Sequence, residues 1–320
     1  MQHHVVIGAG PVGAGIASLL ASRGELVTIV TRSGTGPDHA LFTKLGADAS
    51  DANELVRTAK GAATIYNCVN PAYHRWATDW PPVHTALMTA AERTGAVLVM
   101  MSNLYMFGAD TSMPMRELDG PTARGTKGAV RAGMERDLLA AHAAGRLRAT
   151  FARASDFYGP TVLGAALGER CVPRVLAGKR VSVLGSLDAP HSVSYMPDVV
   201  NTLVTIATDE RAWGKVWHVP NAPATTQRQI VQAFAHAAGT SAKVSAIPKA
   251  ALSLLGIASP MMRELKETWH QWAQPWITDS MLTEQTFGLR ATSLEEGAAA
   301  TIEWWRGRSW CTGIRRTRSR

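Results

Sequence analysis

A G-x-G-x-x-G pattern stands near the N-terminus, between a short apolar stretch and a stretch with helical periodicity. Its residues are Gly8, Ala9, Gly10, Pro11, Val12 and Gly13. The first glycine permits a tight turn, the second lets the backbone approach a pyrophosphate, and the third allows close helix packing. The helix N-terminus then offers N–H groups to phosphate. The pattern predicts a dinucleotide-binding loop; the alternative is a glycine-rich turn that binds nothing.

The end of the next apolar stretch bears on the choice of dinucleotide. An acidic residue at this place bonds the ribose 2′-hydroxyl of NAD, but here the chain has Thr31, Arg32 and Ser33. An arginine can pair with a 2′-phosphate, which a carboxylate would repel. We therefore expect NADP(H) in preference to NAD(H); the alternative is that Arg32 is a solvated loop residue.

The elements that position these residues alternate regularly. Expected strands cover residues 3–8, 25–33, 47–51, 62–70, 96–102 and 147–155, and expected helices cover 11–24, 37–46, 52–61, 84–95 and 126–145. Apolar strands that alternate with helices predict an α/β fold, a Rossmann-type doubly wound parallel sheet. We expect this domain at 1–155, a smaller C-terminal α+β substrate lobe at 156–305, and a basic disordered tail at 306–320.

Composition limits the classes of function. The net charge of +8 lies mostly in the last fifteen residues, which hold six arginines and no acidic residue, so we expect no specific nucleic acid partner. Cys68, Cys171 and Cys311 form no metal-ligand spacing, so no metal is expected, and their low number favours a reducing, cytoplasmic location. No apolar stretch is long enough to predict a membrane span.

In several motifs the chain resembles the extended short-chain dehydrogenase/reductases, the NAD-dependent epimerase/dehydratase group. The motifs are GAGPVG at 8–13, DASD at 48–51, MSNLYMFG at 101–108, RASDFYGP at 153–160, VSYMPDVV at 193–200 and the closing segment 276–305. The resemblance implies a nicotinamide cofactor near Asp48, Ala49 and Asn70, in addition to the glycine loop. It also implies a homodimer through the two long helices that include residues 78–93 and 126–145.

The chain departs from this family at the catalytic positions. The family uses a serine or threonine and a Tyr-x-x-x-Lys pair, but alignment of the motifs places Asn103, Lys127 and Arg131 there. No Tyr-x-x-x-Lys exists in the chain. The family's carbonyl/alcohol mechanism therefore cannot be transferred unchanged.

Three residues are candidates for the missing acid. Lys127 would donate a proton if Arg131 and desolvation lowered its pKa, or else these two and Glu135 form a solvated charged helix face. Tyr105 lies on the loop after the fifth strand and is otherwise a packed aromatic residue. Asp156 replaces the family's asparagine, and its alternative roles are an ion pair with Arg153 or a cap.

The segment NPAYHRWATDWPP follows the fourth strand, at the carboxyl edge where ligands bind in such sheets. We expect His74, Trp76 and Trp80 to line a substrate entrance; simple packing is the alternative for each. The aromatic residues favour an apolar small-molecule substrate.

Two classes of function remain. The first is an NADP(H)-dependent oxidoreductase that transfers a hydride to or from a small molecule with a non-standard proton donor. The second is a catalytically inactive NADP(H)-binding sensor. The missing catalytic pair favours the sensor, whereas the polar residues predicted beside the site favour the enzyme. An epimerase or dehydratase acting on a nucleotide sugar ranks third, because it normally needs the tyrosine.

Overall fold

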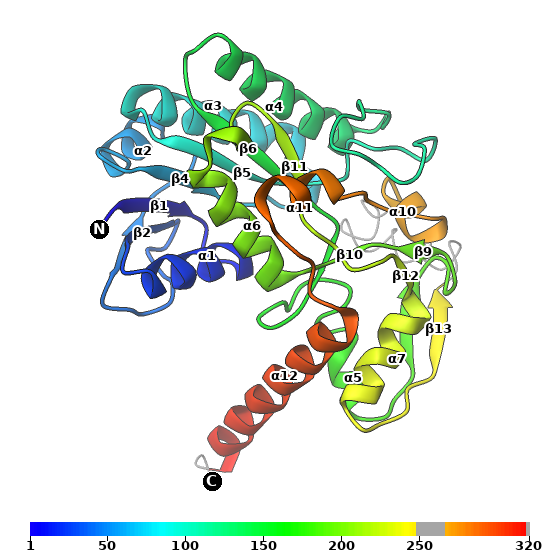
Figure 1. Cartoon of the computed structure of the whole chain (residues 1–320). Helices are drawn as coiled ribbons and strands as arrows, with labels where there is room; N and C mark the ends of the chain where they lie inside the picture. The colour runs from blue at the N-terminus through cyan, green and yellow to red at the C-terminus, as the bar shows by residue number, and fades with distance from the viewer. Residues whose placement is uncertain (248–265, 318–320) are drawn as a thin grey trace. The chain divides into compact units, whose positions relative to one another are not determined.

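The computed structural model describes residues 1–247 and 266–317, with side chains described up to residue 308. The chain divides into two compact units. Figure 1 colours the chain by residue number. Unit 1 comprises 1–154, 199–220 and 279–289, and unit 2 comprises 155–198, 221–278 and 290–320. Unit 1 thus includes two segments that the sequence placed in the substrate lobe.

Unit 1 contains a seven-stranded sheet with the order β11-β6-β5-β4-β1-β2-β3. The strands are β1 (His3–Ile7), β2 (Leu26–Thr31), β3 (Phe42–Gly46), β4 (Thr64–Asn67), β5 (Val97–Asn103), β6 (Ala149–Ala154) and β11 (Val216–His218). All neighbouring strands are parallel, so their carboxyl ends share one edge. The strand order reverses between β1 and β4, which is where ligands bind in such sheets. The predicted Rossmann-type sheet is confirmed.

Helices cover both faces of this sheet. The helical elements are α1 (Pro11–Ser22), α2 (Ala52–Thr58), η1 (Tyr73–Arg75), α3 (Trp76–Thr94), α4 (Thr126–Ala143), α6 (Met196–Thr208), η2 (Glu210–Ala212) and α11 (Met281–Phe287). Figure 1 shows α2, α3 and α4 on one face, and α1 and α6 on the other. β4 and β6 are buried along their whole length, as strands covered on both faces must be.

Three local predictions in unit 1 are wrong. The expected helix at 37–46 is instead a loop followed by β3, and the expected strand at 47–51 is a loop that ends at Asp51, the N-cap of α2. The pairing of β3 with β2 decides this segment, because a sheet edge overrides weak local propensity. The helix expected at 84–95 begins earlier, at Trp76, and includes Pro81 and Pro82.

Unit 2 is built from short elements. These are β7 (Asp156–Tyr158), α5 (Val172–Leu176), β8 (Val181–Leu184), β9 (Pro190–His191), β10 (Val193–Tyr195), β12 (Thr225–Thr226), α7 (Gln227–Ala237), β13 (Val244–Ile247), α10 (Trp269–Ala273) and α12 (Leu294–Thr317). Three two-stranded sheets pair β10 with β7, β12 with β9 and β13 with β8. The N-terminus of α7 carries a capping box of Thr226 and Gln229.

Helices of unit 2 share one apolar core. Phe234 of α7, Val172 of α5 and Ile302 of α12 are all buried in it. α12 continues to Thr317, so the predicted disordered tail is wrong for residues 306–317, whose backbone is helical. Residues 318–320 of that tail lie outside the described residues.

Candidate functional site

The glycine loop connects β1 to α1 at the strand-order reversal. A Cβ atom at Gly13 would lie 1.9 Å from the carbonyl oxygen of Gly8, and one at Gly8, where φ is +104°, would lie 3.0 Å from the backbone of Cys68. A Cβ atom at Gly10 would meet no atom of the described residues within 4 Å. Two glycines are thus required by backbone packing, and the third leaves open space in front of α1.

The first turn of α1 fits an anionic group. Gly10 is the N-cap and supplies no side-chain cap, Pro11 follows at the first helical position, and no acidic residue lies in the turn. The partial positive charge of the helix N-terminus is therefore not neutralised by a local side chain. Val12 is buried behind the loop and holds it against the sheet. These residues fit the pyrophosphate of a dinucleotide.

The predicted ribose-binding segment has an ordered backbone and one exposed cation. The hydroxyl of Thr31 donates to the carbonyl of Thr35 at 2.9 Å, and the hydroxyls of Ser33 and Thr35 lie 2.7 Å apart. Arg32 is exposed beside them. Its side chain is available for a phosphate group.

The segment predicted to lie near the adenine follows β3. Asp48 accepts hydrogen bonds from the N–H and hydroxyl of Ser50, which lower the pKa of its carboxyl; the charge of Arg32 contributes less. Ala49 packs partly against the core of unit 1. Asn70 is exposed in the loop after β4.

An aromatic cluster occupies the region after β4 and β5. The hydroxyl oxygens of Tyr73 and Tyr105 lie 3.0 Å apart. Trp76 stacks on Tyr105 with ring centroids 5.6 Å apart, and Trp80 meets Trp76 edge-on at 6.2 Å. Trp76 and Trp80 are 1% and 0% exposed, respectively, and belong to the core of unit 1. The prediction that these two tryptophans contact substrate is therefore corrected, because a helix that starts at Trp76 turns them inward.

Arg131 lies between the same two tryptophans. Its guanidinium carbon is 4.6 Å from the ring centroid of Trp76 and 4.5 Å from that of Trp80. Burial lowers the pKa of Arg131 to about 10. Among the described residues no carboxylate pairs with it, and its Nε has no hydrogen-bond partner. Two cation–π contacts offset part of the desolvation of this charge.

The remaining candidates of unit 1 are placed as follows. Lys127 is buried in the first turn of α4, and Asn103 ends β5, where its side-chain oxygen accepts the N–H of Tyr105 at 3.1 Å. His74 is exposed in η1. Lys127 and Arg131 are both buried, as is Glu135 one turn further on, so the alternative of a solvated charged helix face is wrong.

Glu135 pairs with an arginine outside α4. Its carboxylate accepts hydrogen bonds from Nε and Nη2 of Arg153, the former at 3.0 Å, and both side chains are buried. Arg153 also donates to the carbonyl of Glu117 at 3.2 Å. This ion pair connects α4 to β6, and it excludes the predicted alternative that Asp156 is the partner of Arg153.

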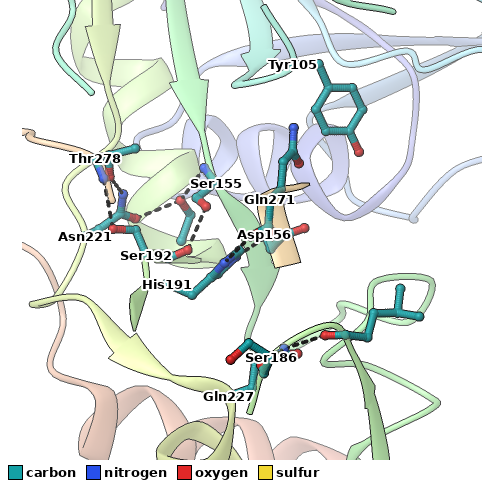
Figure 2. A network of polar contacts seen from close by, with 12 residues as sticks. Tyr105, Ser155, Asp156, Ser186, His191, Ser192, Asn221, Gln227, Gln271 and Thr278 are labelled. Atoms are coloured by element: carbon teal, nitrogen blue, oxygen red, sulfur yellow. Dashed lines mark hydrogen bonds and ion pairs between the residues drawn. The ribbon is translucent and has the colours of Figure 1, made fainter. Parts of the chain in front are cut away.

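In unit 2, Asp156 pairs with a histidine that the sequence did not reveal as a site residue. Oδ2 of Asp156 lies 2.8 Å from Nε2 of His191, and Nδ1 of His191 lies 3.1 Å from the carbonyl oxygen of Gln271. The imidazole stacks on Trp272 with centroids 4.7 Å apart and planes 10° apart. Figure 2 shows this pair among the polar residues of unit 2.

A chain of hydrogen bonds holds the strands that carry Asp156 and His191. The hydroxyl of Ser155 donates to the carbonyl of Ser192 at 2.6 Å. The backbone N–H of Ser155 donates to the hydroxyl of Ser194 at 2.9 Å. Ser194 donates to Asn221 at 2.7 Å, and Asn221 donates to Thr278 at 2.8 Å (Figure 2). The serines are buried, so these bonds fix the register of β7 against β9 and β10.

Sequence reasoning missed Tyr73, His191 and Gln271. Tyr73 had a signal, since it lies in the segment already assigned to the carboxyl edge of the sheet. His191 and Gln271 had none, because their partners are far away in the chain.

The described part of the chain lacks two further features. It holds no group of three or more histidine, cysteine, aspartate or glutamate side chains that is arranged to hold a metal ion. None of its helices combines the length and the hydropathy of a membrane span.

Known structures with this fold include several sugar-nucleotide enzymes. UDP-glucose 4-epimerase from Thermotoga maritima, solved with UDP-glucose, has 19% sequence identity and a TM-score of 0.78, covering 96% of this chain and 99% of that one. WbmH from Bordetella bronchiseptica, solved with NAD+, has 18% identity and a TM-score of 0.73, with the same two coverages. DesIV, a dTDP-glucose 4,6-dehydratase from Streptomyces venezuelae solved with NAD and TYD, has 17% identity and a TM-score of 0.76, covering 97% and 98%.

These identities establish the fold, and the sequence itself establishes the family. A search among curated proteins finds no match. The family model described as "NAD dependent epimerase/dehydratase family" matches residues 4–219, which span all seven strands of unit 1. The resemblance predicted from the motifs is thus confirmed: the chain belongs to the NAD-dependent epimerase/dehydratase family.

Proposed function

We propose that the protein is an oxidoreductase that uses NADP(H) to transfer a hydride to or from a small molecule. The observation that carries this proposal is the open space in front of Gly10, at the uncapped N-terminus of α1 and beside the strand-order reversal. Membership of a nicotinamide-dependent family supports an enzyme over a sensor.

The preference for NADP(H) rests on Arg32. It is exposed after β2, and the side chains next to it are hydroxyls that donate or accept without repelling a phosphate. Asp48, a carboxylate that interacts with Arg32 electrostatically, is already bonded to Ser50. WbmH and DesIV were solved with NAD, so the cofactor of this chain must be determined by direct titration.

Tyr105 is the proton donor that the geometry of unit 1 supports best. It follows β5 at the same sheet edge as the glycine loop, and its hydroxyl has a second phenol, Tyr73, as a hydrogen-bond partner. A nicotinamide held by the glycine loop would supply the hydride in reduction. Tyr105 Oη would then give a proton to the substrate oxygen. Tyr73 Oη would stabilise the resulting phenolate by donating a hydrogen bond, and would pass on a replacement proton that it takes from solvent.

Other residues have supporting roles in this proposal. Asn103 orients the backbone of Tyr105, and Arg131 supplies a fixed positive charge behind the tyrosines. Lys127 remains a competing proton donor. Burial of Trp76 and Trp80 removes the argument for an apolar substrate, so the substrate class is open at this end of the sheet. A homodimer through α3 and α4 is a further expectation, which light scattering tests.

The experiment has two stages. NADPH and NADH are first titrated into the purified protein, and NADPH oxidation is then followed with aldehydes, ketones, enones and UDP-glucose. Binding and turnover support the proposal. Tight binding without turnover of any compound supports the sensor instead, and absence of dinucleotide binding overturns both.

A further inference from the structure

The Asp156–His191 pair in unit 2 has a hydrogen-bond pattern that fixes its proton content. Both ring nitrogens of His191 face acceptors: the Gln271 carbonyl at 3.1 Å and Oδ2 of Asp156 at 2.8 Å. A carbonyl can only accept, so Nδ1 carries a proton. A second proton is then needed between Nε2 and Oδ2, because a bare ring nitrogen and a carboxylate oxygen would repel each other at this distance.

The surroundings of His191 favour the ionic form of the pair. Its imidazole is parallel to the indole ring of Trp272 at 4.7 Å, and a cation is attracted to the face of an aromatic ring. The His191 side chain is 3% exposed, so an imidazolium here needs a bonded carboxylate, which Asp156 provides. One proton is therefore shared between Nε2 of His191 and Oδ2 of Asp156.

This bonding pattern leaves one oxygen of Asp156 available. Oδ2 is occupied by His191, while the side chain is 27% exposed and Oδ1 has no partner among the described residues. A carboxyl group that is bonded to a buried imidazole keeps its orientation. Oδ1 is thus a fixed acceptor that faces away from the buried histidine.

A second unpartnered polar group adjoins the pair. Gln271, whose carbonyl binds His191, is 3% exposed, and its side-chain Nε2 is buried with no hydrogen-bond partner in the described part of the chain. An unsatisfied buried donor costs about 1–3 kcal/mol, so such donors usually have a ligand or water partner. An acceptor on Asp156 and a donor on Gln271, two residues bonded to the same imidazole, match the two hydrogen-bonding roles of an alcohol.

We propose that Asp156, His191 and Gln271 form a site in unit 2 that recognises a hydroxyl group of the substrate. The hydroxyl donates to Oδ1 of Asp156 and accepts from Nε2 of Gln271. His191 is a positioning residue, because it acts through the charge and orientation of Asp156. This inference deepens the proposed oxidoreductase function and rests on it, because only that function makes the bound hydroxyl compound a substrate.

The hydrogen-bond network around the site is consistent with a rigid recognition element. Ser155 precedes Asp156 and is bonded to Ser192, which follows His191, so the two strands cannot shift without breaking buried bonds. Trp276 lies next to His191 through a parallel bridge and is buried. The acceptor and its positioning residue are thus held in place before any ligand arrives.

The first test is nuclear magnetic resonance of the histidine side chains, without any dinucleotide. We expect His191 to give one-bond proton–nitrogen correlations at both Nδ1 and Nε2 near neutral pH. In Asp156→Asn the amide donates to Nε2, so only the Nδ1 correlation should remain. Asp188→Asn, which removes an equal charge from an exposed ion pair in the same unit, is the matched control and should keep both signals.

The second test uses ethylene glycol and 1,2-dimethoxyethane as probes. The diol can donate a hydrogen bond and the diether cannot, although their skeletons are alike. We expect the diol alone to shift the Nε2–H signal of wild type and of Asp188→Asn, and neither probe to shift the remaining His191 signal in Asp156→Ala.

The outcomes separate the two proposals. A single protonated nitrogen in wild type, or equal responses to the diol and the diether, overturns the hydroxyl site even if the protein oxidises NADPH. Conversely, a protein with two protonated nitrogens and a selective response to the diol retains the site even if it fails to bind NADPH. The Asp156 variants change a partly exposed side chain, and a thermal melt confirms that they fold.

Discussion

The hydroxyl oxygens of Tyr73 and Tyr105 lie 3.0 Å apart, although the two residues are 32 positions apart in the chain. One follows β4 and the other follows β5, which are neighbours in the sheet. A phenol that has another phenol as partner can lose its proton and be resupplied. Both residues thus follow the carboxyl ends of neighbouring parallel strands.

Tyr105→Phe should abolish most of the turnover and leave NADPH affinity nearly unchanged. Loss of a positioned general acid lowers the rate by about 10²–10⁴-fold. Steady-state rates and a cofactor titration measure the two effects. Lys127→Met is the discriminating comparison: if it loses the rate and Tyr105→Phe does not, Lys127 is the acid.

Gly10→Ala should weaken NADPH binding without changing stability, whereas Gly13→Ala should destabilise the fold. The added methyl group at Gly10 meets no protein atom within 4 Å, so the melting temperature should stay unchanged while NADPH affinity falls by at least about tenfold, or about 1.4 kcal/mol. At Gly13 it would lie 1.9 Å from a carbonyl oxygen, so the fold should lose about 1–3 kcal/mol. Unaltered NADPH affinity in Gly10→Ala would contradict the assignment of the loop.

Arg32→Asp should weaken NADPH binding by about tenfold to a hundredfold and leave NADH binding nearly unchanged, because a charge-assisted bond contributes about 1.5–3 kcal/mol. Fluorescence titration with both dinucleotides measures the ratio. Arg93→Asp, at another exposed position, controls for the change in net charge. Equal losses for NADPH and NADH in Arg32→Asp would remove the case for NADP(H).

Arg131→Met and Trp80→Ala separate function from packing in the aromatic cluster. Loss of two cation–π contacts is offset by removal of a buried, unpaired charge, so Arg131→Met should change the free energy of unfolding by less than about 1 kcal/mol. Trp80→Ala leaves a cavity at a fully buried position and should lower the free energy of unfolding by about 3–5 kcal/mol. Urea unfolding checks both. If Arg131→Met is as destabilising as Trp80→Ala, Arg131 serves packing.

Stability should fall in mild acid because of His218. Burial, reinforced by the nearby charge of Arg153, lowers the pKa of His218 from 6.5 to about 4. Between these values the unfolded chain binds a proton that the folded protein does not, so the free energy of unfolding decreases by about 3 kcal/mol as pH falls from about 6.5 to 4. Urea unfolding at several pH values in this range should show that the free energy of unfolding depends less steeply on pH in His218→Gln than in wild type. His236→Gln, at an exposed position, should keep the wild-type slope.

The sequence by itself determined the features that depend on local patterns. The glycine loop, the alternation of strands and helices and the ordered motifs predicted the Rossmann-type sheet and the family, because each depends on neighbouring residues or on fixed periodicity. The location of the glycine loop at the end of β1 followed from the same pattern. Asn103 and Tyr105 were likewise placed at the end of β5 from chain order alone.

Tertiary structure decided everything that depends on partners from distant segments. β3 exists because β2 offers it an edge, and the helix that begins at Trp76 turns Trp76 and Trp80 into the core around Arg131. Glu135 pairs with Arg153, and Asp156 with His191, across separations of 18 and 35 residues. No periodicity links such residues, since their proximity arises only when the strands that carry them pair and exclude water.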